Sequence, residues 1–305
     1  MLHRAKPLWI VCALAVSSYL GAAEPLPLKP DRTSGRGRLP TNNALDRITS
    51  KEKEDLPETK VTHLDYSLDG WDLAESPSFR IYHKERSKFA EKVAQTAERT
   101  RVLVQRKWFG SADEAWSPRC QIYLHETAEE FTRATGVPGR VPGYTMIRAD
   151  GTRVLDRRID LCCEDSALLT AVLPHETTHA VTAGRFGEVP VPHWANEGMA
   201  ILGEPQDKID GHLKRLDRFR REGDLFPAEQ LIEFKNYPEK RLVGAFYAES
   251  LSLVDFLTQE KGPKTFTRFM RDGLLYGYDW ALKRNYGWDL DELDGRWRKF
   301  AFGTR

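Results

Sequence analysis

The chain has 305 residues, of which 40% are hydrophobic and 30% are charged. A chain of this length and composition can bury a substantial core, in one large domain or two smaller ones. Its 46 lysine and arginine residues nearly balance its 45 aspartate and glutamate residues, so the formal net charge is only +1. No strong electrostatic field draws it to nucleic acid or to an anionic membrane, and we expect neither as its main partner.

The first 23 residues have the pattern of an export signal. Arg4 and Lys6 precede a mainly apolar run, residues 8–20, which is followed by the small residues Gly21-Ala22-Ala23. This order predicts a signal peptide over residues 1–23 and export to the periplasm, the cell surface or the medium. The apolar run is short for a transmembrane helix, so we expect no membrane span in the mature chain; retention as an uncleaved anchor is the alternative.

Residues 24–60 have the composition of a disordered linker. The segment contains several prolines and the charge run Lys51-Glu52-Lys53-Glu54-Asp55, with few large apolar side chains. The burial of so little apolar surface cannot offset the entropy lost when a backbone is ordered. We therefore expect the folded domain to begin near Val61.

Residues 61–165 are expected to form a strand-rich part with one packed helix. Strand patterns occur in four segments, residues 78–82, 120–124, 144–147 and 154–161, and Asp150-Gly151 marks a hairpin turn between the last two. Apolar residues follow the helical period over residues 87–108. Thr127 with Glu130 three residues later indicates the start of a second, short helix.

From residue 166 the pattern is almost entirely helical. Apolar residues recur with the helical period in segments separated by Gly and Pro, namely 166–184, 193–202, 207–221, 243–261, 263–271, 279–286 and 290–300. Strands followed by helices predict an α+β fold. We expect a small N-terminal mixed sheet with a packed helix and a mostly helical C-terminal half, within one domain over residues 61–305.

The segment His175-Glu176-Thr177-Thr178-His179 points to zinc chemistry. Residues four apart lie on one face of a helix, so His175 and His179 point at a common position and form half of a tetrahedral zinc site. Glu176 lies one residue further round, where its carboxylate reaches a zinc-bound water without ligating the metal. Zinc lowers the pKa of such a water to about 7, and the carboxylate accepts its proton as the hydroxide attacks a carbonyl. Two ordinary histidines on one helix face are the alternative reading.

A third ligand distinguishes these readings, because a catalytic zinc ion needs three protein ligands and one open position. Glu197 lies eighteen residues after His179, and Pro192 between them favours the start of a second helix. That separation covers a loop and one helical turn, so two antiparallel helices can meet at the metal. We therefore predict that His175, His179 and Glu197 bind one Zn²⁺ ion.

Beyond the first motif, the run Trp194-x-x-Glu197-Gly198-x-Ala200 completes a pattern that resembles the gluzincin metallopeptidases, in particular the bacterial peptidase-MA-like group distantly related to thermolysin. The resemblance covers about residues 161–300 and is most specific around the metal motif. It implies the three zinc ligands named above, Glu176 as general base and a peptide or protein substrate. It also suggests that Tyr247 stabilises the oxyanion of the reaction; a tyrosine packed in the helix bundle is the alternative.

These residues together predict an exported zinc metallopeptidase, a hydrolase that attacks a peptide carbonyl. Two alternatives stay open: a non-catalytic binding or assembly protein on a peptidase-like fold, and a zinc amidase with a non-peptide substrate. Glu204 is a candidate to hold an imidazole N–H. The thermolysin-like pattern places a carboxylate four residues after the ligand, and Ile201 stands there instead.

Further polar residues have less certain places. His193 is expected on the surface or the wall of a cleft. Asn196 orients Glu197, binds substrate backbone or is an amide on the helix surface, and these readings are equally open. His212 is expected on a solvated basic helix face. A disulfide from Cys120 to one of the adjacent pair Cys162-Cys163 and three buried free thiols are equally open.

Overall fold

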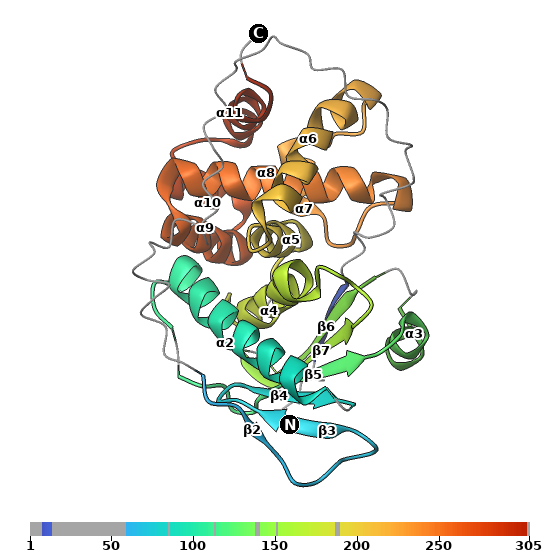
Figure 1. Cartoon of the computed structure of the whole chain (residues 1–305). Coiled ribbons are helices and arrows are strands. Elements are labelled where there is room, and N and C mark those ends of the chain that lie inside the picture. The colour runs from blue at the N-terminus through green and yellow to red at the C-terminus, as the bar shows by residue number, and fades with distance from the viewer. Residues whose placement is uncertain are drawn as a thin grey trace, which may run out of the picture.

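The computed structural model describes residues 8–13, 59–84, 86–112, 114–137, 141–150, 152–186 and 190–303. Most of the predicted signal peptide and nearly all of the predicted linker therefore lie outside the described residues. A mixed β-sheet lies at one end of the molecule, a group of helices lies at the other, and two further helices lie between them (Figure 1). The predicted α+β fold, with strands first and a mostly helical C-terminal half, is confirmed.

The sheet has the strand order β1-β6-β7-β5-β4-β3-β2. Its strands are β1 (Leu8–Ala13), β2 (Thr62–His63), β3 (Asp72–Glu75), β4 (Phe79–His83), β5 (Cys120–His125), β6 (Gly143–Asp150) and β7 (Arg153–Cys162). Strands β4, β5 and β7 run parallel, whereas β6 pairs antiparallel with β7 on one side and with β1 on the other. All four predicted strands are present. The structure adds β3, whose Asp72-Leu73-Ala74-Glu75 sequence has no β-branched or aromatic residue to signal it.

Two helices, α2 (Ser87–Phe109) and α4 (Leu173–Thr182), cover one face of the sheet. Alternate strand residues point toward them, because side chains along a strand alternate between its two faces. These residues pack in one hydrophobic cluster with the small side chains of α2: Phe79, Ile81, Ile122, Leu124, Ile159, Leu161, Ala90, Ala94 and Ala97. The predicted helix over residues 87–108 is thus confirmed, and its alanines allow it to lie close to the sheet.

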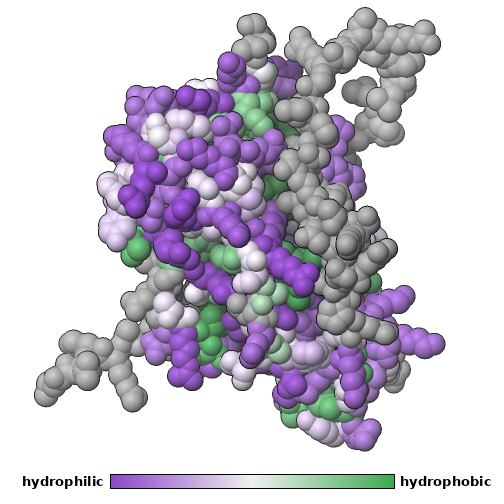
Figure 2. Space-filling model, turned by 90° about the vertical axis from the view of Figure 1, so that its left-hand side faces the viewer, coloured by the Kyte–Doolittle hydropathy of each residue, from purple (hydrophilic) through white to green (hydrophobic). Residues whose placement is uncertain are grey.

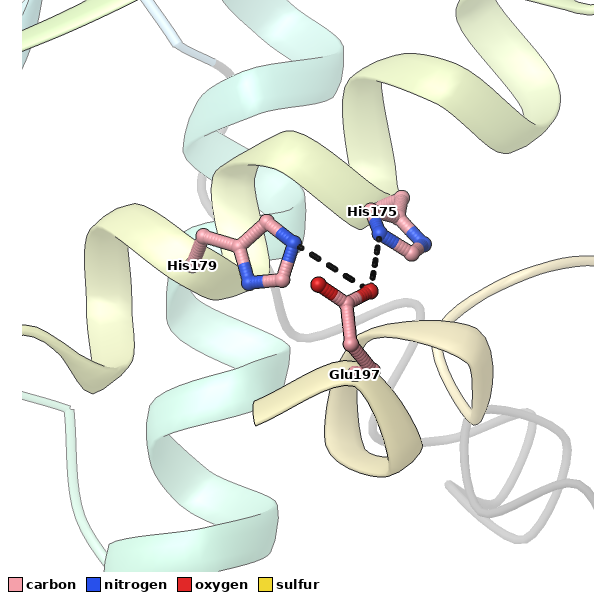
Figure 3. Close-up of side chains that lie close together, drawn as sticks. All are labelled: His175, His179 and Glu197. Carbon is pink, nitrogen blue, oxygen red and sulfur yellow. Dashed lines mark ion pairs between the residues drawn. The ribbon is translucent and has the colours of Figure 1, made fainter. Parts of the chain in front are cut away.

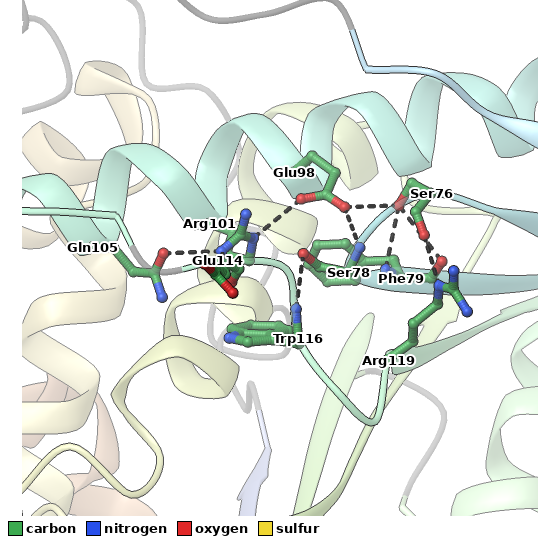
Figure 4. Close-up of polar contacts among 9 residues, drawn as sticks. All are labelled: Ser76, Ser78, Phe79, Glu98, Arg101, Gln105, Glu114, Trp116 and Arg119. Carbon is green, nitrogen blue, oxygen red and sulfur yellow. Dashed lines mark hydrogen bonds and ion pairs between the residues drawn. The ribbon is translucent and has the colours of Figure 1, made fainter.

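A buried polar network fixes α2 to the start of β4 (Figure 4). The carboxylate of Glu98 accepts hydrogen bonds from the backbone N–H of Ser78 at 2.5 Å and from the hydroxyl of Ser76 at 3.0 Å. It also accepts one from Nε of Arg101 at 3.1 Å, and Arg101 in turn donates to Gln105 at 3.0 Å. The buried charge of Glu98 is therefore both paired and hydrogen-bonded, which is the arrangement that a carboxylate in a protein interior requires.

A short helix, α3 (Ala128–Thr135), follows β5 and begins as predicted at Thr127, whose hydroxyl accepts the N–H of Glu130. The C-terminal half then consists of helices: α5 (His193–Ile201), α6 (Gln206–Glu222), α7 (Ala228–Glu233), α8 (Val243–Lys261), α9 (Pro263–Tyr276), α10 (Tyr278–Asn285) and α11 (Leu290–Phe302). The six-residue α7 was not predicted, since it is too short to display the helical period. Trp194, Phe246, Phe266 and Trp297 are fully buried and belong to one hydrophobic core among these helices.

The predicted helix over residues 166–184 differs in its first part. Residues Leu168–Val172 form a π-helical turn, and the regular helix α4 begins at Leu173 with Pro174 in its first turn. Proline is well tolerated there because its missing N–H has no partner within the first turn of a helix.

The expectation for His212 is wrong. Its side chain is only 3% exposed, because it lies on the same stripe of α6 as the buried residues Ile209, Leu213 and Leu216. The basic residues of that helix occupy the other face. The three cysteines whose side chains the structure describes, Cys120, Cys162 and Cys163, are free thiols rather than a disulfide and a thiol.

The face of the molecule in Figure 2 is mainly hydrophilic, and its hydrophobic residues lie in small, separate patches. Large apolar side chains that are exposed include Leu275, Tyr276 and Trp280, near the junction of α9 and α10. Within the part of the chain that the structure describes, no helix has the length and apolar content needed to cross a membrane.

Candidate metal centre

His175 and His179 lie one turn apart on α4, and Glu197 faces them from α5 (Figure 3). Nε2 of His175 is 3.4 Å, and Nε2 of His179 is 3.9 Å, from Oε2 of Glu197. One ligand atom from each of the three residues lies within 4.8 Å of those of the other two. Helices α4 and α5 meet at this point and bring together the three residues that the sequence selected.

The three side chains are buried, with exposed fractions of 0% for His175, 2% for His179 and 0% for Glu197. Nε2 of each histidine and Oε2 of Glu197 have no hydrogen-bond partner among the described residues. Leaving one polar atom buried in this way costs about 1–3 kcal/mol, and here three such atoms converge. Two imidazole nitrogens and one carboxylate oxygen are the donor set of a catalytic zinc site, so these residues fit a zinc ion.

Glu204 orients one of these ligands. Its Oε1 lies 2.7 Å from Nδ1 of His175. A carboxylate that accepts the Nδ1–H leaves the lone pair of Nε2 for a metal, and such partners commonly support histidine ligands. The chain can place Glu204 here because α5 ends at Ile201 and the following turn comes back to α4, where Gly203 lies against Pro174 and Thr178. The candidate role of Glu204 as the imidazole's partner is thereby supported by a contact.

Tyr237 is a site residue that the sequence did not reveal. It lies in the loop between α7 and α8, and its hydroxyl donates a hydrogen bond to Oε1 of Glu197 at 2.5 Å. The tyrosine that the sequence did predict, Tyr247, is buried on α8, with its ring centroid 6.2 Å from that of Tyr237. Tyr237 is forty residues from its partner Glu197. No periodic pattern links positions so far apart. The oxyanion role of Tyr247 stays a prediction.

Glu176 is fully buried between α4 and the sheet. Its Oε2 accepts a hydrogen bond from the hydroxyl of Thr145 on β6 at 2.5 Å, and its Oε1 has no partner among the described residues. Gly143 allows this approach: a Cβ atom at that position would lie 2.8 Å from both Cγ and Oε1 of Glu176 and 2.6 Å from Val172. The strand and the carboxylate therefore fit together only because position 143 has no side chain.

The pKa shifts of Glu176, His179 and Glu197 are consistent with the roles expected for a base and two metal ligands. Burial raises the pKa of Glu176 to about 8, against the opposing effects of His175 and of the hydrogen bond from Thr145. Burial lowers the pKa of His179 to about 4, which keeps this imidazole neutral and able to ligate a metal. Burial acts to raise the pKa of Glu197, but the two histidines and the hydroxyl of Tyr237 outweigh it, so the pKa is lowered and the carboxylate is ionised.

His175 behaves differently from His179. Burial acts to lower its pKa, yet the nearby carboxylates of Glu197 and Glu204 raise it above the ordinary value. A protonated His175 cannot bind a cation, so metal and proton compete for this nitrogen. Metal uptake at this site is therefore expected to release a proton.

Asn196, His193 and Gly198 lie next to the three clustered residues and make packing or hydrogen-bond contacts with neighbouring elements. Asn196 accepts a hydrogen bond from the hydroxyl of Thr182 at 2.9 Å and so joins α5 to α4. His193 is half-buried, with its ring 4.5 Å from that of Tyr237. Gly198 does allow a close helix approach, but to α8: a Cβ there would lie 2.5 Å from the backbone oxygen of Ser250.

Comparison of the chain with protein-family models, with characterised proteins and with solved structures found no match.

Proposed function

We propose that the chain is a zinc-dependent hydrolase that cleaves peptide bonds, with His175, His179 and Glu197 as the zinc ligands and Glu176 as the general base. One observation carries this proposal: three buried ligand atoms without hydrogen-bond partners among the described residues converge between α4 and α5. Glu176, next to His175 in the sequence, is also buried, with one carboxylate oxygen that has no such partner. Buried histidines elsewhere, such as His83, also have ring nitrogens without hydrogen-bond partners among the described residues, so the convergence of three ligand atoms is what distinguishes this site. The resemblance to gluzincin metallopeptidases points to the same residues.

Zinc, when bound, supplies Lewis acidity that acidifies water and polarises a carbonyl oxygen. The protein's part in the reaction is proton transfer and orientation. Thr145 holds Oε2 of Glu176 and leaves Oε1 to accept the proton of the attacking water. A base with a pKa of about 8 can take that proton and then deliver it to the leaving amine near neutral pH. Glu204 and Tyr237 keep His175 and Glu197 in position.

An extended peptide is the substrate class that we favour over a non-peptide amide. Strand β6, which bears Gly143 and Thr145 beside the base, pairs along its other edge with the extended segment Leu8–Ala13. The register runs antiparallel from Leu8 opposite Ala149 to Ala13 opposite Tyr144. Backbone hydrogen bonds of this kind bind extended segments of varied sequence. Cleavage of the proposed signal peptide, with export of the chain, would free this edge for a substrate peptide.

The experiment is metal analysis of the purified chain, together with cleavage assays of wild type, Glu176→Gln and His179→Ala on a peptide library. We expect about one zinc ion per chain in wild type and in Glu176→Gln, and none in His179→Ala. Cleavage by Glu176→Gln should fall about 10²- to 10⁴-fold, the usual contribution of a general base.

His193→Ala is the matched control, because it removes a half-buried histidine beside the site without removing a proposed ligand. It should keep its zinc. A wild-type chain without zinc would overturn the metal site. Stoichiometric zinc with no cleavage of any peptide would favour the binding or assembly protein, and cleavage restricted to non-peptide amides would favour the amidase.

A further inference from the structure

A cavity lies where α2, the turn after α4, and α9 meet, and it shares no residue with the metal centre. It has a volume of about 290 Å³ and is lined by Trp108, Phe109, Arg185, Lys264, Thr267, Arg268 and Arg271. Four of these seven described lining residues are cationic and none is acidic. Such a concentration of positive charge is unusual in a chain whose net charge is only +1.

The cationic side chain of Arg268 is held by a group that does not neutralise it. Nε of Arg268 donates to the amide oxygen of Asn285 at 2.9 Å, while Asp272 accepts a hydrogen bond from the same amide. The guanidinium of Arg185 lies 4.7 Å from the centre of the Phe109 ring. Among the described residues, no carboxylate lies within ion-pair distance of Lys264, Arg268 or Arg271.

The cavity's walls are also fixed relative to one another. The hydroxyl of Thr267 on α9 donates to the backbone oxygen of Trp108 on α2 at 3.2 Å. The end of the Lys264 side chain lies over Gly110, where a Cβ atom would come within 2.7 Å of its Cε. Three of the four cationic groups project from α9, and α9 is fixed against α2 at this point. A ligand would therefore not have to order the backbone that carries them.

Another cavity in the molecule contains two arginines that lie beside a carboxylate. It has about 320 Å³ and is lined in part by Arg80 and Arg119. Both arginines lie beside Glu75, at 2.6 Å and 3.5 Å from its carboxylate oxygens. One carboxylate therefore offsets part of the positive charge of that cavity, whereas no carboxylate among the described residues lies within ion-pair distance of Lys264, Arg268 or Arg271.

We propose that the cavity on α9 binds the phosphate group of a small anionic ligand. Arg268 and Arg271 are three residues apart and so share one face of α9, from which two guanidinium groups can engage phosphate oxygens in pairs. Lys264 lies in the first turn of α9, where the helix dipole adds positive potential. A phosphate carries more charge than a carboxylate and matches several cations better. The volume, close to the lower limit for ligand pockets, suits a small ligand.

The test is a binding titration of the purified full chain with inorganic phosphate and with pyrophosphate, at constant ionic strength set with chloride. Wild type should bind and show a rising melting temperature with ligand concentration. The variant Arg268→Glu/Arg271→Glu should bind at least about tenfold more weakly, because two charge-assisted contacts become repulsive.

The matched control is Arg218→Glu/Arg221→Glu, which makes the same charge change on the exposed face of α6. It should bind phosphate like wild type. Equal loss in both double variants, or no loss in either, would overturn the proposal. Arg268→Gln/Arg271→Gln removes the charges without reversing them and should also weaken binding, which guards against a folding defect in the glutamate variant.

A final arm distinguishes the source of the phosphate. Vesicles of phosphatidylcholine with and without phosphatidic acid are mixed with the same variants. Binding to phosphatidic acid vesicles that depends on Arg268 and Arg271 would identify a lipid headgroup, and binding of the soluble anions alone would identify a free phosphate compound. Failure of all these ligands to bind wild type would overturn the site, whatever the outcome for zinc and cleavage.

Discussion

Helices α2 and α4 cover the same face of the sheet and both bury glutamate side chains, but they treat them in opposite ways. Glu98 of α2 is paired with Arg101 and accepts two further hydrogen bonds from Ser76 and Ser78. On α4, Oε1 of Glu176 and Nε2 of both histidines have no hydrogen-bond partner among the described residues. Burial by itself is therefore not a sign of function; a satisfied buried carboxylate fixes architecture, whereas unsatisfied groups that converge indicate a ligand.

The largest effect is expected at Glu98, whose replacement tests whether the network on α2 stabilises the fold without affecting the metal site on α4. Glu98→Ala should lower the free energy of unfolding by about 3–5 kcal/mol, because it leaves a buried guanidinium and a buried N–H without their acceptor. Denaturant titration measures this loss. Zinc content should be unchanged, since the network shares no residue with the metal centre. Glu98→Gln keeps one acceptor oxygen and should cost less; a loss of zinc in either variant would contradict the separation of the two helices' roles.

A smaller effect is expected at Glu204. This residue contacts the proposed ligand His175 but is not itself a proposed ligand, so it tests whether a buried glutamate can support metal binding indirectly. Glu204→Gln should weaken zinc binding about 10- to 100-fold, the usual effect of removing a carboxylate that supports a ligating histidine. Competition with a chromophoric chelator measures the affinity. Glu98→Gln serves as the control for a buried glutamate elsewhere. Unchanged zinc affinity would show that the contact with His175 does not support the metal.

A pH-dependent effect concerns a third buried glutamate, Glu249 on α8, which accepts the backbone N–H of Phe226. Burial raises its pKa to about 9, above the ordinary value of 4.5. The protonated form is thus favoured in the folded state, so its stabilising effect is complete below pH 4.5 and is lost as the pH rises toward 9. The slope in that window approaches about 1.4 kcal/mol per pH unit.

Glu249→Gln should therefore stabilise the chain at pH 7 by up to about 3 kcal/mol and have little effect at pH 4.5. Denaturant titrations at the two pH values measure the difference. The same stabilisation at both values would mean that the carboxyl group is not protonated in the folded chain.

The sequence predicted the parts of the site that follow helix geometry. His175 and His179 were found from their spacing within one helix, and Glu197 from its distance along the chain. Glu204 was a candidate on the same grounds. Tyr237 could not be found, because a loop places it against Glu197 and no periodic rule relates them.

The fold was predicted to a similar extent as the site: the elements with a clear sequence pattern were identified and the others were not. Strands and helices with clear periods were recovered, whereas β3 and α7 are too short or too weakly patterned to be recognised. The error at His212 arose because its basic neighbours were given more weight than the stripe formed by Ile209, Leu213 and Leu216. The contact of Gly143 with Glu176 joins a strand to a helix, and only the folded chain reveals it.

The contact between Gly143 and Glu176 has a consequence for transferring the site to another protein. The three proposed metal ligands come from residues 173–201, all within two consecutive helices. The carboxylate of Glu176 is positioned by Gly143 and Thr145, which belong to the sheet. A protein engineer who grafted the two helices onto another scaffold would carry over the metal-binding module but lose the alignment of its base. The graft would be expected to bind zinc without hydrolysing a substrate. Hydrolysis would require that β6 be transferred together with the two helices.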